Sequence, residues 1–494
     1  MHGEPMPRHL MVLDVGTTSV RCILFGEDGS QESIVSLPVR QMYPEDGWVE
    51  QDPVEMWASC RQVMVDAAAS IKGSIVAIGI TNQRETTIVW DGSGRPVYNA
   101  IVWQDRRTSS LCHDLVDGGH AEDIASRTGL KIDPYFSATK ISWILDNVPG
   151  ARERAIQGEL HFGTVDSWIL WNLTGGRIHA TDPSNASRTM LFDIRSLSWD
   201  PHLLEMFSVP SSMMPEVRPS SSDFGEVDES ILGYPIHVMS VIGDQQAALA
   251  GQCCFRKGDL KVTLGTGGFM LMNIGSSPKL SSEGLLTTVA WTIDGRTEYA
   301  MEGSVYMAGA AVQWLAEGLN IIADPGESSD LACSVDDTCG CYVVPAFTGL
   351  GAPYWDPDVR GTILGLTRAT RREHIVRATL ESIAFQVHDV MAAMSNGSAG
   401  GVDRIKLDGG AGANDFLCQF LSDVTGSEVL RSDYRESTAR GAAVLASIST
   451  GFWSQEVLMG VDYDSFVPAR AADAVSGDID RWHHAVDCAR RWRV

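Results

Sequence analysis

The sequence lacks the marks of several large protein classes. It has no apolar run long enough to cross a membrane, although 44% of its 494 residues are hydrophobic. Basic residues are scarce beside acidic ones, since 38 Lys and Arg against 63 Asp and Glu give a net charge of −25. A surface for nucleic acid or anionic lipid needs a basic face. We therefore expect no nucleic-acid partner and no stable membrane insertion.

The ten cysteines lack the spacing of a metal or redox site. They form no C-x-x-C pair and no Cys/His pattern of a zinc site. Cys333, Cys339 and Cys341 are close in sequence, but loop thiols in a reducing compartment explain them more simply than a metal cluster does. This cysteine usage predicts a cytoplasmic protein.

The common phosphate-binding motifs are also missing. There is no G-x-x-x-x-G-K-[ST], and no G-x-G-x-x-G follows an apolar strand. Two Gly/Thr turns are present instead, at residues 16–19 and 265–268, and such turns present backbone N–H groups and hydroxyls to an anion. Because a chain at −25 repels ATP at long range, phosphate binding would depend on these local donors, a cation such as Arg21, and Mg²⁺. The alternative for each turn is a purely structural role.

An internal repeat places these turns in equivalent positions. Leu10–Phe25 and Leu260–Ile274 both read as an apolar strand, a Gly/Thr turn and a second apolar strand, about half the chain apart. This spacing suggests two domains on one plan, with coincidence between two hairpins as the alternative. We place the boundary near Gly251–Gly258, which gives domains at residues 1–252 and 253–494.

Other segments alternate between strand and helix patterns, which indicates an α/β protein with mixed sheets. A nearly continuous apolar run predicts a buried strand at Ile75–Thr81. Further strand candidates are Thr86–Trp90, which follows a polar turn, Ile236–Ile242, Tyr342–Pro345 and Arg404–Leu407. Apolar residues at helical spacing predict helices at Pro53–Ala69, Ser137–Asp146, Val305–Ala316 and Arg371–Met394. The stretch Gly460–Ala474 reads as a loop.

Polar side chains stand at the ends of predicted strands. A carboxylate there, as at Asp14 and Asp244, suits a water-coordinated Mg²⁺ or a base that accepts a hydroxyl proton. Arg84 and Glu85 lie between two apolar strands and could donate to and accept from the hydroxyls of a small polyol, although a solvated hairpin turn would look the same. The Gly-rich stretch 408–414 would let a flat ring or a phosphate approach the backbone, and its alternative is a tight strand-to-helix turn.

Taken together, these segments resemble the FGGY family of carbohydrate kinases, within the actin-like ATPase superfamily, and among its members the glycerol kinases. The resemblance covers roughly Leu10 to Trp453. Its matching stretches are residues 14–19, 47–53, 78–90, 99–107, 135–147, 162–168, 185–192, 243–249, 264–273, 342–361 and 408–414.

The resemblance implies two actin-like (ribonuclease H-like) domains with mixed sheets flanked by helices and a cleft between them. It also implies MgATP-dependent phosphorylation of glycerol to sn-glycerol 3-phosphate by a homodimer or homotetramer. By position, the polyol ligands would be Arg84, Glu85, Tyr135, Asp244 and Gln245, with Trp103 and Phe269 as apolar walls. Asp244 would be the general base, and Asp14 the carboxylate near Mg²⁺. The ATP site would consist of Thr17, Thr18, Ser19, Arg21, Thr266, Gly309, Gln313, Gly410 and Asn414.

Two other functions fit parts of this pattern. One is a kinase for another polyol or a ketose, since relatives in the family change the acceptor pocket and keep the phosphate loops. The other is an ATP-binding switch or chaperone on the actin-like plan. That last alternative assigns no role to Arg84, Glu85, Tyr135 and Asp244, so the sequence favours a glycerol-phosphorylating enzyme.

Overall fold

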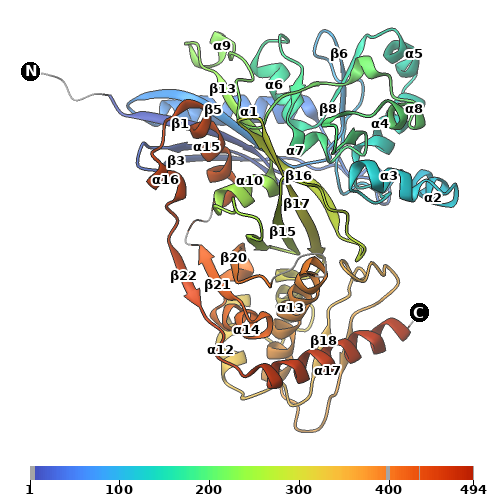
Figure 1. The fold of residues 1–494 in the computed structure, drawn as a ribbon, viewed down its shortest axis with the longest axis vertical. Coiled ribbons are helices and arrows are strands. Elements are labelled where there is room, and N and C mark those ends of the chain that lie inside the picture. The colour runs from blue at the N-terminus through green and yellow to red at the C-terminus, as the bar shows by residue number, and fades with distance from the viewer. Residues whose placement is uncertain (1–5, 396–400, 433, 435, 493–494) are drawn as a thin grey trace, which may run out of the picture.

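The computed structural model describes residues 6–395, 401–432, 434 and 436–492, and it contains two large sheets (Figure 1). The sheet of the N-terminal half has the order β13-β5-β1-β2-β3. Its strands are β1 (Arg8–Val15), β2 (Ser19–Phe25), β3 (Gln31–Pro38), β5 (Ser74–Asn82) and β13 (Val238–Gly243). Figure 1 shows the second sheet below it, running towards the helices of the C-terminal half.

The second sheet has the order β16-β17-β15-β14-β20-β21-β22. Its strands are β14 (Leu260–Leu264), β15 (Gly268–Gly275), β16 (Leu286–Ile293), β17 (Arg296–Val305), β20 (Arg404–Asp408), β21 (Glu428–Ser432) and β22 (Tyr463–Phe466). In the described part of the chain no helix is both long and apolar enough to span a bilayer.

The two sheets repeat one topology. In each, an antiparallel hairpin, β1–β2 or β14–β15, has a further antiparallel strand on one side, β3 or β17. On its other side lie two parallel strands, β5 and β13 or β20 and β21. The repeat seen in the sequence is therefore a repeat of structure, and it places the two Gly/Thr turns at equivalent hairpins.

Two helices join the halves through glycine contacts. α10 (Asp244–Gly251) follows the N-terminal sheet and packs against α15 (Ser437–Thr450) of the C-terminal half. A Cβ on Gly251 would lie 1.9 Å from the Ser437 carbonyl oxygen, and a Cβ on Gly441 would lie 1.8 Å from the Ala247 carbonyl oxygen. Only glycine permits this approach, so these two residues fix how closely the halves meet.

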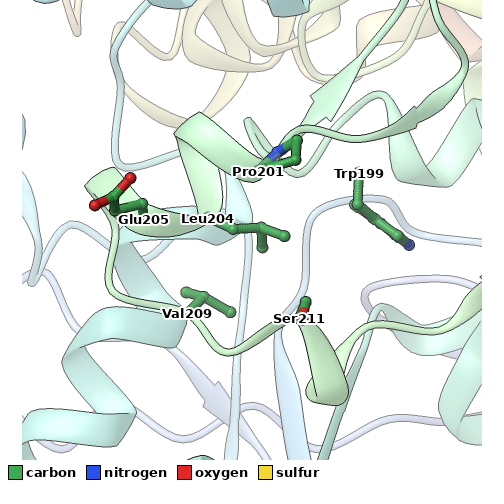
Figure 2. A pocket seen from close by; sticks show the side chains of 6 residues that line it. All are labelled: Trp199, Pro201, Leu204, Glu205, Val209 and Ser211. Carbon is green, nitrogen blue, oxygen red and sulfur yellow. The ribbon is translucent and has the colours of Figure 1, made fainter.

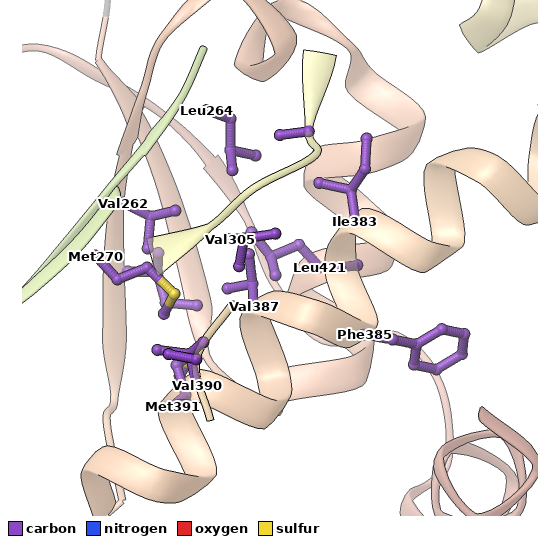
Figure 3. Packing of buried hydrophobic residues seen from close by; sticks show 14 of the residues in the cluster. Val262, Leu264, Met270, Val305, Ile383, Phe385, Val387, Val390, Met391 and Leu421 are labelled. Atoms are coloured by element: carbon purple, nitrogen blue, oxygen red, sulfur yellow. The ribbon is translucent and has the colours of Figure 1, made fainter. Parts of the chain in front are cut away.

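The largest core cluster lies under the second sheet (Figure 3). The long helix α13 (Arg372–Ser395) packs Ile383, Val387 and Val390 against the sheet, which contributes Val262 and Met270. Complete burial of each such side chain contributes about 1.5–3 kcal/mol. This packing holds β14, β15 and β17 on the helix and so supports the turns at their ends.

Most predicted elements are confirmed, with small shifts at their ends. α1 spans Pro53–Ala69 as expected, with Asp52 accepting hydrogen bonds from the Val54 and Glu55 backbone N–H groups. The strand predicted at Ile75–Thr81 is β5, and β6 (Ile88–Asp91) and β18 (Tyr342–Val344) also form. α4 (Ser137–Asn147) matches the second predicted helix.

Two predictions are wrong at their boundaries. The helix expected over Val305–Ala316 is α11 (Gly309–Glu317), because Val305 pairs with Gly268 as the last residue of β17. The supposed loop Gly460–Ala474 contains β22, which pairs with β21, and ends in the first residues of α17 (Ala472–Arg491). Both errors arise because sheet pairing with a distant strand outweighs the local pattern.

Asp389 anchors the C-terminal helix α17 on α13. Its Oδ2 accepts hydrogen bonds of 2.7 Å from both Trp482 Nε1 and Tyr354 Oη, and its Oδ1 lies 2.8 Å from His483 Nε2. The Trp482 ring also stacks on Phe385, with centroids 5.4 Å apart. Burial opposes ionisation of Asp389, but its hydrogen bonds to His388, His483, Trp482 and Tyr354 lower its pKa to about 2.

We predict that Asp389→Ala lowers the free energy of unfolding by about 1–3 kcal/mol for each donor left unpartnered. Urea denaturation at pH 7 measures this, with the exposed Asp480→Ala on α17 as the control. Because the folded-state pKa of Asp389 lies below the ordinary 3.8, its contribution is complete above about pH 4 and is lost as the pH falls through about 2. Equal unfolding free energies for Asp389→Ala and Asp480→Ala would contradict this anchoring.

Candidate functional site

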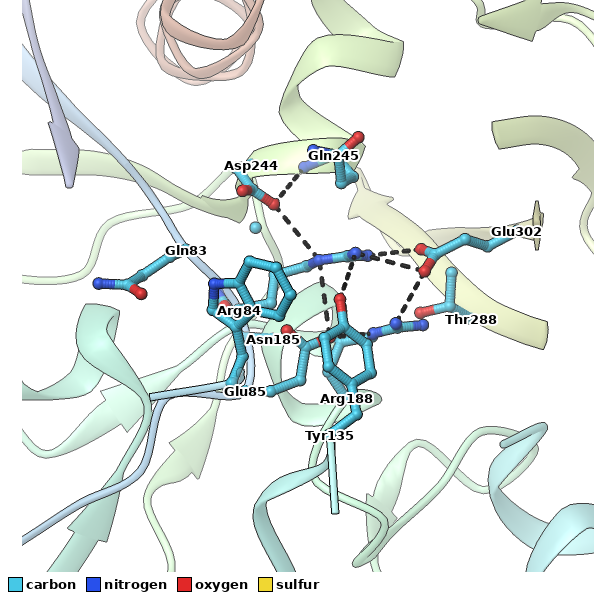
Figure 4. A network of polar contacts seen from close by, with 12 residues as sticks. Gln83, Arg84, Glu85, Tyr135, Asn185, Arg188, Asp244, Gln245, Thr288 and Glu302 are labelled. Atoms are coloured by element: carbon cyan, nitrogen blue, oxygen red, sulfur yellow. Dashed lines mark hydrogen bonds and ion pairs between the residues drawn. The ribbon is translucent and has the colours of Figure 1, made fainter. Parts of the chain in front are cut away.

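Four buried charged side chains form a closed ring at the junction of the halves (Figure 4). Arg84 Nη1 donates to Glu302 Oε2 at 2.7 Å, and Arg188 Nη2 donates to Glu302 Oε1 at 2.8 Å. Arg188 Nε donates to Glu85 Oε1 at 2.6 Å, and Arg84 Nε lies 3.7 Å from the same oxygen. Each side chain is at most 3% exposed, so the charges are balanced by one another and not by water.

The ring combines residues from distant elements. Arg84 and Glu85 follow β5, and Glu85 adopts a left-handed backbone conformation with φ of 63°. Such a conformation is uncommon for a residue other than glycine, and it often marks a functional position. Arg188 lies just after the short helix α7 (Pro183–Ala186), whereas Glu302 comes from β17 of the second sheet.

Asp244 lies beside this ring and is the more accessible group. It is the first residue of α10, its Oδ1 accepts from the Gln245 backbone N–H, and the same oxygen is 3.3 Å from Arg84 Nε. Its side chain is 30% exposed. Desolvation raises the pKa of Asp244 above its ordinary value, which Arg84 partly offsets. A carboxylate with a raised pKa is more basic than a free aspartate.

Two of the three predicted aromatic residues, Tyr135 and Trp103, pack against each other beside the ring. The Tyr135 hydroxyl is 3.5 Å from Arg84 Nη2, and the Tyr135 ring meets the Trp103 ring edge to face at 5.6 Å. Phe269 lies on β15 opposite Ser304, two residues along β17 from Glu302. Side chains two residues apart on a strand share one face, so Phe269 lies on the face of the sheet that carries Glu302.

The first Gly/Thr turn connects β1 to β2 and contacts the predicted polyol wall. The Trp103 indole Nε1 donates to Thr17 Oγ1 at 2.9 Å, and the Gly16 N–H donates to the Ser19 carbonyl. The Arg21 guanidinium pairs with Asp14 and lies 2.5 Å from Glu436 Oε2. Arg21, expected to neutralise phosphate, is thus held between two carboxylates. Thr18 and Ser19 complete the turn.

The second Gly/Thr turn packs against the start of α11, another predicted nucleotide segment. The Gly309 N–H donates to the Gly265 carbonyl at 2.8 Å, and the Ala308 N–H donates to the Thr266 carbonyl at 2.9 Å. A Cβ on Gly309 would lie 2.6 Å from the Gly265 oxygen, whereas a Cβ on Gly410 would meet nothing within 4 Å. The structure therefore brings residues 265–266 and Gly309 together and leaves open space above Gly410.

The remaining predicted nucleotide residues have contacts of their own. Asn414 accepts from the Leu417 N–H as the N-cap of α14 (Asp415–Thr425) and donates to Ser328 Oγ at 3.0 Å. Gln313, one turn into α11, donates to Glu317 at 2.7 Å. Neither contact joins these residues to the turn at Gly265.

Four further residues of the site were not predicted from the sequence: Arg188, Gln246, Lys261 and Glu302. Gln246 accepts from Arg84 Nη1 at 3.2 Å. The buried Lys261 ammonium donates to Gln245 Oε1 at 2.8 Å and to Thr263 Oγ1 at 2.9 Å. The available signal was Lys261, a charge between the apolar residues of a short strand, because a charge is buried there only when paired. The strand of Glu302 contains other charged residues and gave no such signal.

Two cavities lie away from these residues. One of about 390 Å³ is lined by Trp199, Pro201, Leu204, Glu205, Val209 and Ser211 (Figure 2). The other, of about 340 Å³, is lined by residues 52–54 and 96–99. Neither wall contains a predicted site residue or an ion pair between its own residues. Convergent charged groups mark a chemical site better than volume does, so we assign the site to the ring and the two turns.

Comparison with known proteins agrees with this architecture. Residues 9–251 match the N-terminal domain of the FGGY family of carbohydrate kinases, and residues 260–450 match its C-terminal domain. The chain belongs to the FGGY family of carbohydrate kinases. The expected α/β fold with two actin-like domains is thereby confirmed.

Individual relatives cover the whole chain. The chain is 52% identical to a glycerol kinase of Symbiobacterium thermophilum, over 98% of this chain and 99% of that protein. It is 51% identical to a glycerol kinase of Caldanaerobacter subterraneus subsp. tengcongensis, over 99% of each. Among solved structures it is similar to Plasmodium falciparum glycerol kinase with ADP, with a TM-score of 0.94, 35% identity and 98% of each chain covered. Gluconate kinase from Lactobacillus acidophilus, at 20% identity, shares the fold.

We predict that Gly309→Ala weakens ADP binding about tenfold or more. The added Cβ would lie 2.6 Å from the Gly265 oxygen, so the second turn must shift. Isothermal titration with ADP measures the effect. Gly92→Ala is the control, because a Cβ there meets nothing within 4 Å. Wild-type ADP affinity in Gly309→Ala would show that this turn does not hold the nucleotide.

Proposed function

We propose that this protein transfers the γ-phosphoryl group of ATP to glycerol and forms sn-glycerol 3-phosphate. The observation that carries the proposal is the juxtaposition of three groups: Arg84 as donor, Glu85 as acceptor, and Asp244 as an accessible carboxylate 3.3 Å from Arg84. Together they can hold neighbouring hydroxyls of a small polyol and accept a proton from one of them. The names of relatives about 50% identical over the full chain support the same substrate.

The site residues divide into polyol and nucleotide groups in this proposal. Arg84, Glu85, Tyr135 and Gln245 hold the hydroxyls of glycerol, and Trp103 and Phe269 flank its carbon chain. As the attacking glycerol oxygen forms its bond to the γ-phosphorus, the bond from that phosphorus to the β,γ-bridging oxygen breaks and ADP leaves. Asp244 accepts the proton of the attacking hydroxyl. Its raised pKa makes it a stronger base than an ordinary aspartate.

The residues predicted to form the ATP site fit a bound nucleotide. A Cβ on Gly410 would meet nothing within 4 Å, so a phosphate or a flat ring could approach the backbone there. The two Gly/Thr turns lie at strand ends, where such turns can present backbone donors to an anion. Thr17, Thr18, Ser19 and Arg21 would hold phosphate on one side, and Thr266, Gly309, Gln313, Gly410 and Asn414 would hold the rest of ATP. Asp14 would be the carboxylate near Mg²⁺ when the ion is bound with ATP, and the ion would supply neutralising charge for the phosphoryl group.

Three wider properties belong to the same proposal. The domains extend over residues 1–252 and 253–494, and closure of the cleft between them excludes water as a competing acceptor. The first family match ends at residue 251 and the second begins at residue 260, which supports this boundary. The protein acts in the cytoplasm as a homodimer or homotetramer.

A coupled assay for ADP release with glycerol, dihydroxyacetone, erythritol and D-xylulose tests the acceptor. We expect glycerol to give the highest kcat/KM. A higher value for D-xylulose or erythritol would identify a kinase for another ketose or polyol. Equal ATP turnover with and without any acceptor would indicate an ATP-driven switch.

We predict that Asp244→Asn folds, binds ATP and loses about 10²–10⁴-fold in kcat, because an amide accepts no proton. The pH dependence gives an independent check. Since the pKa of Asp244 is raised above 3.8, wild-type kcat/KM should fall at acidic pH, beginning above the range of an ordinary aspartate. Asp244→Asn should lose this acidic limb. Retention of more than a tenth of wild-type kcat would exclude Asp244 as the base.

A further inference from the structure

We propose that Glu302 and Arg188 are positioning residues that hold Arg84 and Glu85 in their polyol-binding orientation. Through Glu302, this orientation depends on the C-terminal half of the protein. The inference rests on the proposed function, in which Arg84 and Glu85 contact glycerol. Arg188 and Glu302 have no role in that proposal as it stands.

The hydrogen bonds divide the Arg84 guanidinium into two edges. The Glu302 carboxylate accepts hydrogen bonds from Arg84 Nη1 at 2.7 Å and from Arg84 Nη2 at 3.3 Å. The Nε edge is left facing Asp244 at 3.3 Å and Glu85 at 3.7 Å. Because a guanidinium is planar and its donors have fixed directions, the grip of Glu302 on one edge sets where the other edge points.

Arg188 sets the orientation of the Glu85 carboxylate. Its Nε donates to Glu85 Oε1 at 2.6 Å, while its Nη2 donates to Glu302 at 2.8 Å. The Arg188 guanidinium is also enclosed by aromatic rings, 5.6 Å from the centroid of Tyr135 and 5.3 Å from that of Phe136. Arg188 thus links the acceptor group of the polyol site to the carboxylate that orients its donor.

Charge makes Glu302 necessary for this arrangement. Arg84 and Arg188 carry like charges, and each is paired to Glu302 between them. Burial opposes the ionisation of Glu302, but the two guanidinium groups lower its pKa to about 2, so it is charged at any assay pH. Without this charge, the two buried guanidinium groups would have only Glu85 and the partly exposed Asp244 as counter-ions.

Glu302 is fixed by the second sheet. It lies on β17 between Leu271 of β15 and Leu286 of β16. The β16–β17 hairpin reaches the N-terminal half, where Thr288 Oγ1 is 2.9 Å from Ser187 Oγ, one residue before Arg188. Gln246, which accepts from Arg84, also donates to the Val289 carbonyl at 3.2 Å. The orienting carboxylate is therefore carried by the sheet whose β14–β15 hairpin forms the second Gly/Thr turn.

Steady-state kinetics of Glu302→Gln test the inference, since the change removes the charge and keeps the shape. We expect the KM for glycerol to rise at least tenfold and the KM for ATP to change less than threefold. Glu298→Gln is the matched control. It lies on the same strand, its carboxylate accepts from Asn273 Nδ2 at 2.6 Å, and no contact joins it to the described ring residues. We expect Glu298→Gln to leave both KM values unchanged.

A double-variant cycle separates positioning from a general structural role. If Glu302 acts through Arg84, then Arg84→Gln combined with Glu302→Gln should raise the glycerol KM by less than the product of the two single effects. The remaining effect of Glu302→Gln is expressed through Arg188 and Glu85. If the two KM effects multiply, or if Glu302→Gln raises both KM values equally, the inference is overturned. Wild-type glycerol KM in Glu302→Gln would also overturn it.

Arg188→Lys provides a second variant if Glu302→Gln does not fold. Lysine keeps the charge, but its single ammonium cannot reproduce the planar fork that spans Glu85 and Glu302. We expect the same selective rise in glycerol KM, and an unchanged value would count against the inference. Failure of the wild-type protein to phosphorylate glycerol would instead count against the proposed function. The same series would then be measured with the acceptor that the wild type does phosphorylate.

Discussion

The site depends on the burial of four charges that balance only as a set. Removing one member of the ring formed by Arg84, Glu85, Arg188 and Glu302 would leave an uncompensated charge where water cannot reach it. Buried ion pairs add little net stability compared with apolar packing, because desolvation offsets their attraction. What they supply is direction, since guanidinium and carboxylate groups pair in few geometries. In the proposed function, the ring therefore orients side chains around a small polar ligand.

Close backbone approach is the second condition for this geometry. Gly251 and Gly441 allow α10 and α15 to touch, and Asp244 begins the same α10. Gly309 in turn allows α11 to begin against the second Gly/Thr turn. Side-chain atoms at these points would separate the elements that carry the Asp244 carboxylate and the predicted nucleotide segments. Glycine thus fixes distance between elements, and the charged ring fixes the orientation of the side chains between them.

Much of the architecture could be predicted because its signals are local. The two hairpins show apolar strands on either side of a Gly/Thr turn, and α1 begins at an Asp-Pro pair that caps a helix. The Gly265 turn and Gly309 do meet in the structure, as their assignment to one nucleotide site requires. The prediction failed where pairing was distant. β17 extends to Val305 because β15 pairs with it, and β22 forms because β21 is its neighbour.

By itself, the sequence determined the α/β class, the duplicated hairpins with their turns, and the strand-end groups Arg84, Glu85 and Asp244. Each of these features depends on a short run of residues. Only the tertiary structure decided which charges meet. Arg84 and Glu302 are 218 residues apart, and Arg188 and Glu302 are 114 apart. Nothing near either partner specifies the other. Their pairing arises when the β16–β17 hairpin packs against α7, since a buried charge is tolerated only where that packing supplies its counter-ion.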